Sequence, residues 1–341
     1  MTKINHCMII AEAGVNHNGE LKLALELIRA AKEAGADAVK FQTFRADDLV
    51  SADTPKAEYQ KKNTDAGESQ HEMLRRLELS HDDHIKLVDA CREAGITFLS
   101  TGFDSRSLAF LESLQMPVYK IPSGELTNLP LLRQVAGFGK PVIMSTGMAS
   151  LEEIGASMEV LERGGVPRQE ITLLHCTTQY PAPMANVNLR AMLSLGEEFP
   201  GVRVGYSDHT LGIEVPIAAA ALGARVLEKH FTLDRSMDGP DHAASLEPDE
   251  LKQMVASVRN IEEALGSGVK EPCADELATR EVARKCVVAA SAIEKGDEFT
   301  EENLTVKRSS GGVSPMLWDQ LLGRVAMNSY AVDEVIERVE L

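Results

Sequence analysis

The sequence has few positive charges and no cluster of them. It contains 35 Lys and Arg residues against 52 Asp and Glu residues, for a formal net charge of −17. Sequence-independent binding to nucleic acid requires a concentrated positive surface, and the sequence has no basic run, so we expect no nucleic-acid partner. Acidity of this degree mainly favours solubility. An anionic substrate would have to be held by a few local lysines, arginines or backbone N–H groups.

Cysteine pairs and long apolar runs are missing as well. The five cysteines are widely separated and form no C-x-x-C pair, which fits neither a disulfide framework nor a zinc knuckle. The first apolar run covers residues 7–11 and ends at Glu12, so it is too short for a secretory signal. No stretch reaches the roughly 20 apolar residues of a membrane span. We therefore expect a cytoplasmic protein without a membrane partner.

Short apolar or β-branched runs alternate with longer helical patterns as far as residue 265. The runs lie at residues 8–11, 38–41, 97–100, 118–121, 142–145, 171–175, 202–206 and 226–231. Between them, apolar residues recur with the period of a helix, as at Leu21, Leu25 and Ile28. Strand–helix alternation of this length predicts a (β/α)₈ TIM barrel over residues 1–265, since such barrels typically have about 250 residues. An open doubly wound sheet is the alternative, but no G-x-G-x-x-G or P-loop supports it.

The character of the sequence changes after Leu265. Glycines and Pro272 indicate a linker over residues 266–284, which ends in a charged helical stretch at 276–284. The remaining residues, 285–341, contain short β-type runs at 286–289, 304–306 and 335–339. A tail of about 57 residues is small for an independent hydrophobic core. We expect this domain to pack against something else.

Polar residues collect where the predicted strands end, and ligands of parallel barrels bind at that edge. Glu12 follows the first run, and Lys40 and Gln42 lie two residues apart and so on the same strand face. Lys120 lies in the fourth run. A lysine in an apolar strand is costly unless it is paired or binds a ligand. We interpret Lys40 and Lys120 as functional rather than as parts of structural ion pairs.

Two histidines, His209 and His230, follow the seventh and eighth runs. Imidazoles on adjacent strand ends, near Glu12, Glu125 and Asp208, could bind a divalent ion and leave positions open for water and substrate. A hydrogen-bonded histidine pair is the alternative.

Hydroxyls add to the same edge. Ser145-Thr146-Gly147 precedes a predicted helix and suits a phosphate or carboxylate, although a helix cap is also an ordinary role for such residues. Asp241 lies in a turn past the eighth run and either holds a polyhydroxyl substrate or forms the turn. We interpret His175, in the sixth run, as a structural histidine.

The residue types alone leave several functions open. A Schiff-base aldolase would use one strand-end lysine as nucleophile, and a metal-dependent aldolase would use the histidine pair to polarise a carbonyl. A phosphoenolpyruvate-condensing synthase would use the lysines for the anion and a metal for the acceptor aldehyde. A non-catalytic sugar-binding scaffold is a further alternative. The long polar segment between the second and third runs, residues 47–71, is either a lid or a solvated excursion.

Several motifs together resemble the bacterial sialic acid synthase family, the N-acetylneuraminate and legionaminate synthases. The matching stretches are IIAEAGVNHNG (9–19), GADAVKFQTF (35–44), YKIPSGE (119–125), STGM (145–148), LLHCTTQYPAP (173–183), GYSDHT (205–210), LEKHFTLD (227–234) and DGPDHAAS (238–245). They span essentially the whole chain in order. The resemblance implies a TIM barrel followed by a small antifreeze-like (SAF) domain, in a homodimer whose tail domains close the partner's active site. It leans toward the legionaminate branch.

The resemblance also implies a reaction and residue roles. The family condenses phosphoenolpyruvate with an N-acetylated mannosamine-type sugar and releases phosphate by C–O cleavage. Residues expected to hold phosphoenolpyruvate are Lys40, Lys120, Ser123, Ser145, Ser207 and Thr178, the last standing where many members carry Asn. His209 and His230 would bind Mn²⁺ or Mg²⁺, and Glu125 would act as a base or orient water. Residues expected on the sugar side are Glu12, Gln42, Asn63, Tyr180, Asp241 and, from the partner chain, Arg308.

Overall fold

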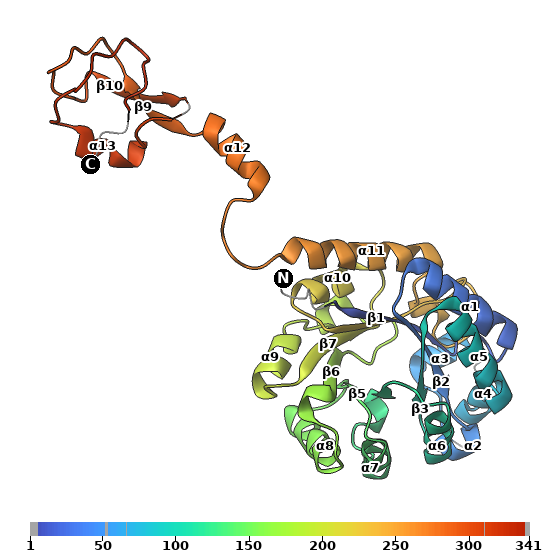
Figure 1. The fold of residues 1–341 in the computed structure, drawn as a ribbon. Coiled ribbons are helices and arrows are strands. Elements are labelled where there is room, and N and C mark those ends of the chain that lie inside the picture. The colour runs from blue at the N-terminus through green and yellow to red at the C-terminus, as the bar shows by residue number, and fades with distance from the viewer. Residues whose placement is uncertain (1–5, 52–53, 66, 310, 338–341) are drawn as a thin grey trace. The chain divides into compact units, whose positions relative to one another are not determined.

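The eight apolar runs form parallel strands that close into a barrel (Figure 1). The computed structural model describes residues 6–51, 54–65, 67–309 and 311–337. The strands are β1 Met8–Gly14, β2 Ala38–Thr43, β3 Thr97–Gly102, β4 Tyr119–Ile121, β5 Val142–Ser145, β6 Ile171–Cys176, β7 Arg203–Asp208 and β8 Val226–His230. Each pairs in parallel with the next, and β8 pairs with β1 to complete the ring. The predicted TIM barrel is confirmed.

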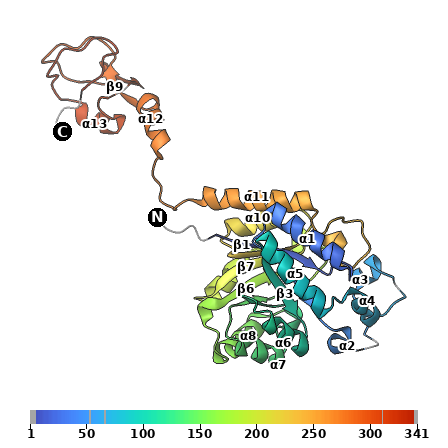
Figure 2. The ribbon, with the colours of Figure 1, turned by 45° about the vertical axis from the view of Figure 1, so that its right-hand side comes forward.

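Helices surround the barrel, as Figure 1 and Figure 2 both show. They are α1 Leu21–Ala34, α2 Ala46–Leu49, α3 Glu58–Asn63, α4 Gln70–Leu77, α5 His81–Ala94, α6 Ser105–Ser113, α7 Leu129–Gly137, α8 Leu151–Arg163, α9 Ala191–Glu198, α10 Glu214–Ala221 and α11 Pro248–Leu265. Their ends follow local sequence signals. In α5, Ser80 Oγ accepts the Asp83 N–H at the start, and Gly95 ends the helix with a left-handed φ of 68°.

The barrel interior has an apolar floor below a polar layer. The floor contains Ile10, Ala38, Leu99, Ile143, Leu174 and Val226. Strand residues two positions apart share a face, so the next inward residues on the same strands are Glu12, Lys40, Thr101, Ser145, Cys176 and Glu228. All six are buried. The polar layer above the floor therefore brings charged and hydroxyl groups together at the carboxyl ends of the strands.

Strands β7 and β8 approach each other closely because of one glycine. A Cβ atom on Gly205 would lie 2.2 Å from the Val226 carbonyl oxygen, a distance that real side chains do not tolerate. Glycine at this position lets the two strands pair as far as Asp208 and Lys229. Their carboxyl ends, with His209 and His230, are thereby brought side by side.

The chain divides into two compact units, Met1–Gly266 and Ser267–Leu341. The second contains α12 Ala274–Ala283, the antiparallel strands β9 Lys285–Ala289 and β10 Leu304–Arg308, and α13 Trp318–Leu321. It buries its own hydrophobic cluster, which includes Val287, Phe299 and Leu321. The expected run at residues 335–339 is not a strand over its described part, because Val335 makes only an isolated bridge to Val288. Val339 lies outside the described residues.

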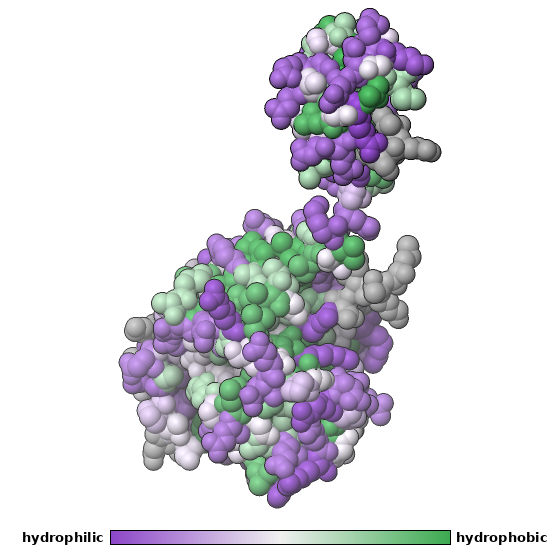
Figure 3. All heavy atoms as spheres, turned by 90° about the vertical axis from the view of Figure 1, so that its left-hand side faces the viewer, coloured by the Kyte–Doolittle hydropathy of each residue, from purple (hydrophilic) through white to green (hydrophobic). Residues whose placement is uncertain are grey.

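Some hydrophobic side chains remain exposed on both units. Met148 and Met184 of the barrel unit are exposed, as is Met316 of the second unit at 89%. Figure 3 shows an area on one face of the barrel unit where hydrophobic residues gather among hydrophilic ones. Patches of this kind are typical of surfaces that contact another chain. Within the described part of the chain, no helix is long and apolar enough to cross a membrane.

Candidate active site

A cavity of about 230 Å³ lies at the carboxyl ends of the barrel strands. Most of the site residues predicted from the sequence line it. They are Glu12, Lys40, Gln42, Lys120, Ser123, Ser145, Thr178, Tyr180, Ser207, His209 and His230. Residues from all parts of the barrel sequence therefore meet at one point, as expected from strand-end positions in a parallel barrel.

Lys40 and Glu12 form a buried ion pair in this cavity. Lys40 Nζ lies 2.7 Å from Glu12 Oε2 and donates a hydrogen bond to Thr101 Oγ1 at 2.9 Å. Gln42 Nε2 approaches the other Glu12 oxygen at 3.3 Å. Burial acts to lower the pKa of Lys40, but Glu12 and Glu228 outweigh it and raise that pKa. Burial raises the pKa of Glu12 to about 7 despite the pull of Lys40, so Lys40 is charged and Glu12 can exchange a proton near neutral pH.

Glu228 is a second carboxylate close to both lysines of the cavity, and sequence reasoning missed it. Its carboxylate oxygens lie 3.5 Å from Lys120 Nζ and 3.8 Å from Lys40 Nζ, and Ser207 Oγ donates to it at 3.2 Å. Burial would raise the pKa of Glu228, but Lys120 and Lys40 hold it below its usual value. The available signal was its spacing, two residues before His230 and so on the same strand face. Thr101 was missed as well, and it too could have been found from the alternation of side chains along its strand.

The second lysine is less strongly paired. Lys120 Nζ donates to Ser145 Oγ at 2.7 Å, but burial lowers its pKa and Glu228 only partly opposes this. An anion beside Lys120 therefore favours its charged form. Glu228 supplies that anion in the free protein, and a bound phosphate or carboxylate would supply it in a complex.

Hydroxyl and amide groups form another wall of the cavity. The Gly147 N–H donates to Ser123 Oγ at 3.0 Å, and Ser123 Oγ lies 3.2 Å from Cys176 Sγ. A Cβ atom on Gly147 would lie 2.6 Å from Thr178 Cγ2 and 2.8 Å from Ser123 Oγ. Glycine at position 147 is therefore what allows these groups to approach. Burial raises the pKa of the Cys176 thiol, which disfavours the thiolate.

His209 and His230 face each other across the ends of β7 and β8, with ring centroids 5.4 Å apart. His209 Nδ1 donates to the Thr177 carbonyl at 2.7 Å. His230 Nδ1 is buried without a hydrogen-bond partner among the described residues and lies 3.9 Å from Asp241 Oδ2. Burial lowers the pKa of both histidines. Neutral imidazole is the form that binds metal ions.

The donor atoms suit a divalent ion with two protein nitrogen ligands. Within the described ranges, no cluster of three or more His, Cys, Asp and Glu side chains is arranged for a metal, so water or substrate oxygens would fill the remaining positions. Asp208, expected near these histidines, is instead bound by Lys229 at 2.5 Å. It is not available as a ligand.

Four predicted site residues lie outside the cavity lining. Glu125, in the turn after β4, accepts a hydrogen bond from Asn128 Nδ2 at 2.5 Å. Asn63, at the end of α3, donates to the Pro240 carbonyl at 3.1 Å. Asp241 is buried next to His230, and burial raises its pKa to about 6. Arg308 ends β10 in the second unit and is exposed there.

The segment between β2 and β3 contributes an aromatic residue that the sequence did not single out. Tyr59 of α3 stacks on Tyr180 with ring centroids 4.9 Å apart, and Tyr180 in turn lies 4.1 Å from the His209 ring. Part of this segment therefore packs at the site rather than extending into solvent. His175 donates to the Val187 carbonyl at 2.7 Å, in keeping with the structural role expected of it.

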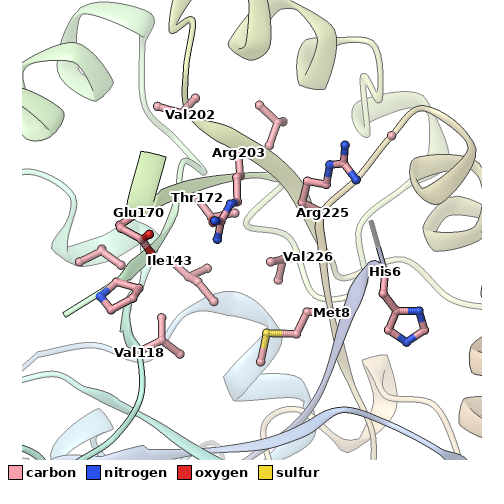
Figure 4. Close-up of a pocket in the computed structure, with 14 residues that line it drawn as sticks. His6, Met8, Val118, Ile143, Glu170, Thr172, Val202, Arg203, Arg225 and Val226 are labelled. Carbon is pink, nitrogen blue, oxygen red and sulfur yellow. The ribbon is translucent and has the colours of Figure 1, made fainter. Parts of the chain in front are cut away.

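A larger cavity, of about 730 Å³, lies at the other end of the barrel (Figure 4). It is lined by Met8, Val118 and Val226, which belong to or pack on the barrel floor, together with Arg203 and Glu170. The lysines and the histidine pair are not among its lining residues. The cavity at the carboxyl ends therefore holds the candidate active site.

Comparisons with known proteins identify both parts of the chain. Residues 27–270 match the NeuB family, and residues 284–337 match the SAF domain. The chain is 50% identical to the N,N'-diacetyllegionaminic acid synthase of Campylobacter jejuni, over 96% of this chain and 98% of that protein. It is 49% identical to the synthase of that name from Legionella pneumophila, over 94% and 91%. The solved N-acetylneuraminic acid synthetase of Leptospira borgpetersenii, crystallised with citrate, is 34% identical, with a TM-score of 0.70 over 81% of this chain and 92% of that one.

Proposed function

The chain belongs to the NeuB family, and from that premise we propose that it is a nonulosonic acid synthase that condenses phosphoenolpyruvate with an N-acetylated mannosamine-type sugar and releases phosphate. The observation that carries the proposal is the presence of two buried lysines and two buried histidines around one cavity. Two relatives near 50% identity are named as diacetyllegionaminic acid synthases. We therefore propose the 2,4-diacetamido-trideoxy sugar as acceptor, with N-acetylmannosamine as the alternative.

Phosphoenolpyruvate would bind between the lysines and the hydroxyl wall. Lys40 and Lys120 supply positive charge, and Ser123, Ser145 and Ser207 supply hydroxyls that line the same cavity. Thr178 would complete the phosphate contacts. Buried cations attract an anion more strongly than cations in water, and they need no rearrangement when charge develops during the reaction.

His209 and His230 would hold Mn²⁺ or Mg²⁺, which polarises the sugar aldehyde when it is bound. Burial lowers the pKa of both histidines, which favours the neutral form that keeps a lone pair for this role. On the sugar side, Gln42 and Tyr180 line the cavity. Glu12 lines the same cavity beside Lys40, and a pKa raised to about 7 by burial suits proton transfer near neutral pH.

In the proposed reaction, carbon 3 of the enol attacks the aldehyde carbon and carbon 2 takes up a water before phosphate leaves with C–O cleavage. We propose Glu125 as a base or water-orienting group, a role that requires its carboxylate to leave Asn128. Glu12 and Glu228 already line the cavity. Comparing the pH profiles of activity of Glu12→Gln and Glu125→Gln shows which carboxylate performs the proton transfer.

The remaining sugar contacts would come from Asn63, Asp241 and a second subunit. We propose a homodimer in which Arg308 of one chain reaches the N-acyl group bound by the other. The exposed guanidinium of Arg308 and the exposed Met316 in the same unit support a role in binding outside their own unit.

Phosphate release from phosphoenolpyruvate tests the function. We expect release with Mn²⁺, loss of release with a chelator, and faster release with the diacetamido-trideoxy sugar than with N-acetylmannosamine. Lys40→Met should lower kcat/KM by on the order of 10²–10³-fold, the usual cost of losing one charge-stabilising group. Lys56→Met, which removes a buried lysine paired with Glu68 instead, is the matched control and should retain activity.

A Schiff-base aldolase is the alternative that one observation favours, because burial lowers the pKa of Lys120 and a neutral lysine is a nucleophile. Borohydride reduction in the presence of pyruvate distinguishes the two. A covalent adduct on Lys120 or Lys40 would exclude the synthase. Absence of phosphate release with either sugar at any metal concentration would leave a non-catalytic sugar-binding scaffold.

A further inference from the structure

We propose that Lys229 is a positioning residue that fixes the spacing of His209 and His230 and thereby makes them a metal site. The inference rests on the proposed function, since it concerns the ion expected there. Lys229 immediately precedes His230 on β8, so its side chain points to the opposite face of the strand. That face lies away from the cavity, and the side chain is 0% exposed.

The Lys229 ammonium holds both neighbours of His209. It lies 2.5 Å from Asp208 Oδ2 and also donates to the Thr210 carbonyl. The Asp208 carboxylate in turn accepts the Thr210 N–H at 3.1 Å and the Thr210 hydroxyl at 3.0 Å. The residues before and after His209 are therefore tied to the residue before His230. His209 cannot move relative to His230 without breaking a buried charged contact.

Two further bonds fix His209 from the other side. Its ring donates to the Thr177 carbonyl at 2.7 Å, and its own carbonyl accepts the Ala182 N–H at 2.8 Å. With β6 on one side and β8 on the other, the ring has little freedom. Functional groups must be held to within about 0.5 Å to act together, so this degree of restraint suits a metal ligand.

An ion pair at this place is not explained by stability alone. Lys229 and Asp208 are both completely buried, and replacing a buried ion pair with apolar residues of similar size is often neutral or stabilising. An apolar pair, however, could not hold the Thr210 carbonyl or orient the loop that carries His209. The position of the pair therefore points to control of geometry.

The test compares two doubly neutralised variants for Mn²⁺ binding, measured from the free-ion signal in electron paramagnetic resonance. Asp208→Asn/Lys229→Met removes the pair without leaving a lone buried charge. Asp37→Asn/Arg259→Met is the control, because Arg259 Nη2 and Asp37 Oδ2 form a 2.7 Å pair, partly exposed, that does not involve His209 or His230. Melting temperature and phosphoenolpyruvate affinity are measured on the same samples.

We expect the Mn²⁺ Kd of Asp208→Asn/Lys229→Met to rise by about 10–100-fold, the usual effect of losing a group that orients metal ligands. Its phosphoenolpyruvate affinity should change little, because Lys40 and Lys120 keep their own partners, and the control should bind Mn²⁺ like the native protein. Unchanged Mn²⁺ affinity with a lowered melting temperature would overturn the inference and leave the pair purely structural.

Thr210→Val provides a second test if the double variant does not fold. It keeps the shape of the residue and removes only the hydroxyl bond to Asp208. Mn²⁺ affinity should fall by a few-fold, and an unchanged affinity would count against the inference. Native protein that binds no Mn²⁺ would overturn the metal site itself, whereas native binding with unaffected variants overturns only the role of Lys229.

Discussion

Replacing Glu228 with glutamine tests how charge is balanced in the active-site cavity. The Glu228 carboxylate lies 3.5 Å from Lys120 Nζ and 3.8 Å from Lys40 Nζ. At an effective dielectric constant of about 20, each attraction is on the order of 4 kcal/mol before desolvation offsets it. Removing one partner from a buried ion pair costs about 3–5 kcal/mol, because the remaining charge stays buried without compensation.

The Glu228→Gln variant is expected to depend on a bound ligand for its thermal stability. Without substrate, its melting temperature should fall by roughly 10 °C, since each kcal/mol shifts a domain of this size by about 2–4 °C. In the proposed complex, phosphoenolpyruvate would bring negative charge to the same two lysines. Addition of phosphoenolpyruvate should therefore raise the melting temperature more in the variant than in the native protein, as measured by thermal shift in matched buffers.

Glu68→Gln is the control, because Glu68 pairs with the buried Lys56 and neither residue lines the cavity. Its melting temperature should also fall, but its response to phosphoenolpyruvate should match that of the native protein. An equal or smaller response in Glu228→Gln would refute the reasoning. It would mean that Glu228 supports substrate binding instead of taking the place of substrate charge in the free protein.

Three further predictions concern other parts of the chain. Burial, reinforced by His84, lowers the pKa of His17 from 6.5 to about 3. Between these pH values His17 binds a proton in the unfolded chain but not in the folded protein. Stability should fall as pH drops below 6.5, by about 2 kcal/mol at pH 5, and urea unfolding of His17→Asn should lack this component. Gly205→Ala should cost about 1–3 kcal/mol by forcing β7 from β8, whereas Gly137→Ala, with no atom within 4 Å of the added carbon, should not destabilise. Arg308→Ala should raise the KM of the sugar more than that of phosphoenolpyruvate, and mixing it with a barrel-inactive subunit should restore turnover only if sites are shared between chains.

The barrel could be predicted from the sequence because its strands are short apolar runs separated by long amphipathic helices. The runs at residues 142–145 and 226–231 differ from β5 and β8 by at most one residue. The strands of the tail were harder to predict. Its run at residues 335–339 has the composition of a strand, but Val335 forms only an isolated bridge. Composition alone does not say whether a partner strand is available.

The candidate active site was predictable where a polar residue interrupts an apolar strand, and it was harder to predict elsewhere. Lys40 and Lys120 stood out for that reason, and both line the cavity. Glu228 was hidden by its neighbours Lys229 and His230, and only strict alternation along the strand separates the inward pair from the outward lysine. Tyr59 comes from a loop helix whose packing on Tyr180 depends on the folded chain.

Closure of the barrel through β1 and β8 also has a consequence for synthesis of the chain. Met8–Gly14 is almost entirely buried in the finished protein and needs β8 on one side. At about 5–20 residues per second, a ribosome needs on the order of 10–40 seconds to add the roughly 210 residues between them. During that time the first strand presents an unpaired apolar edge, which is a hazard for aggregation. The nascent barrel is therefore a candidate client for chaperones until residue His230 has emerged.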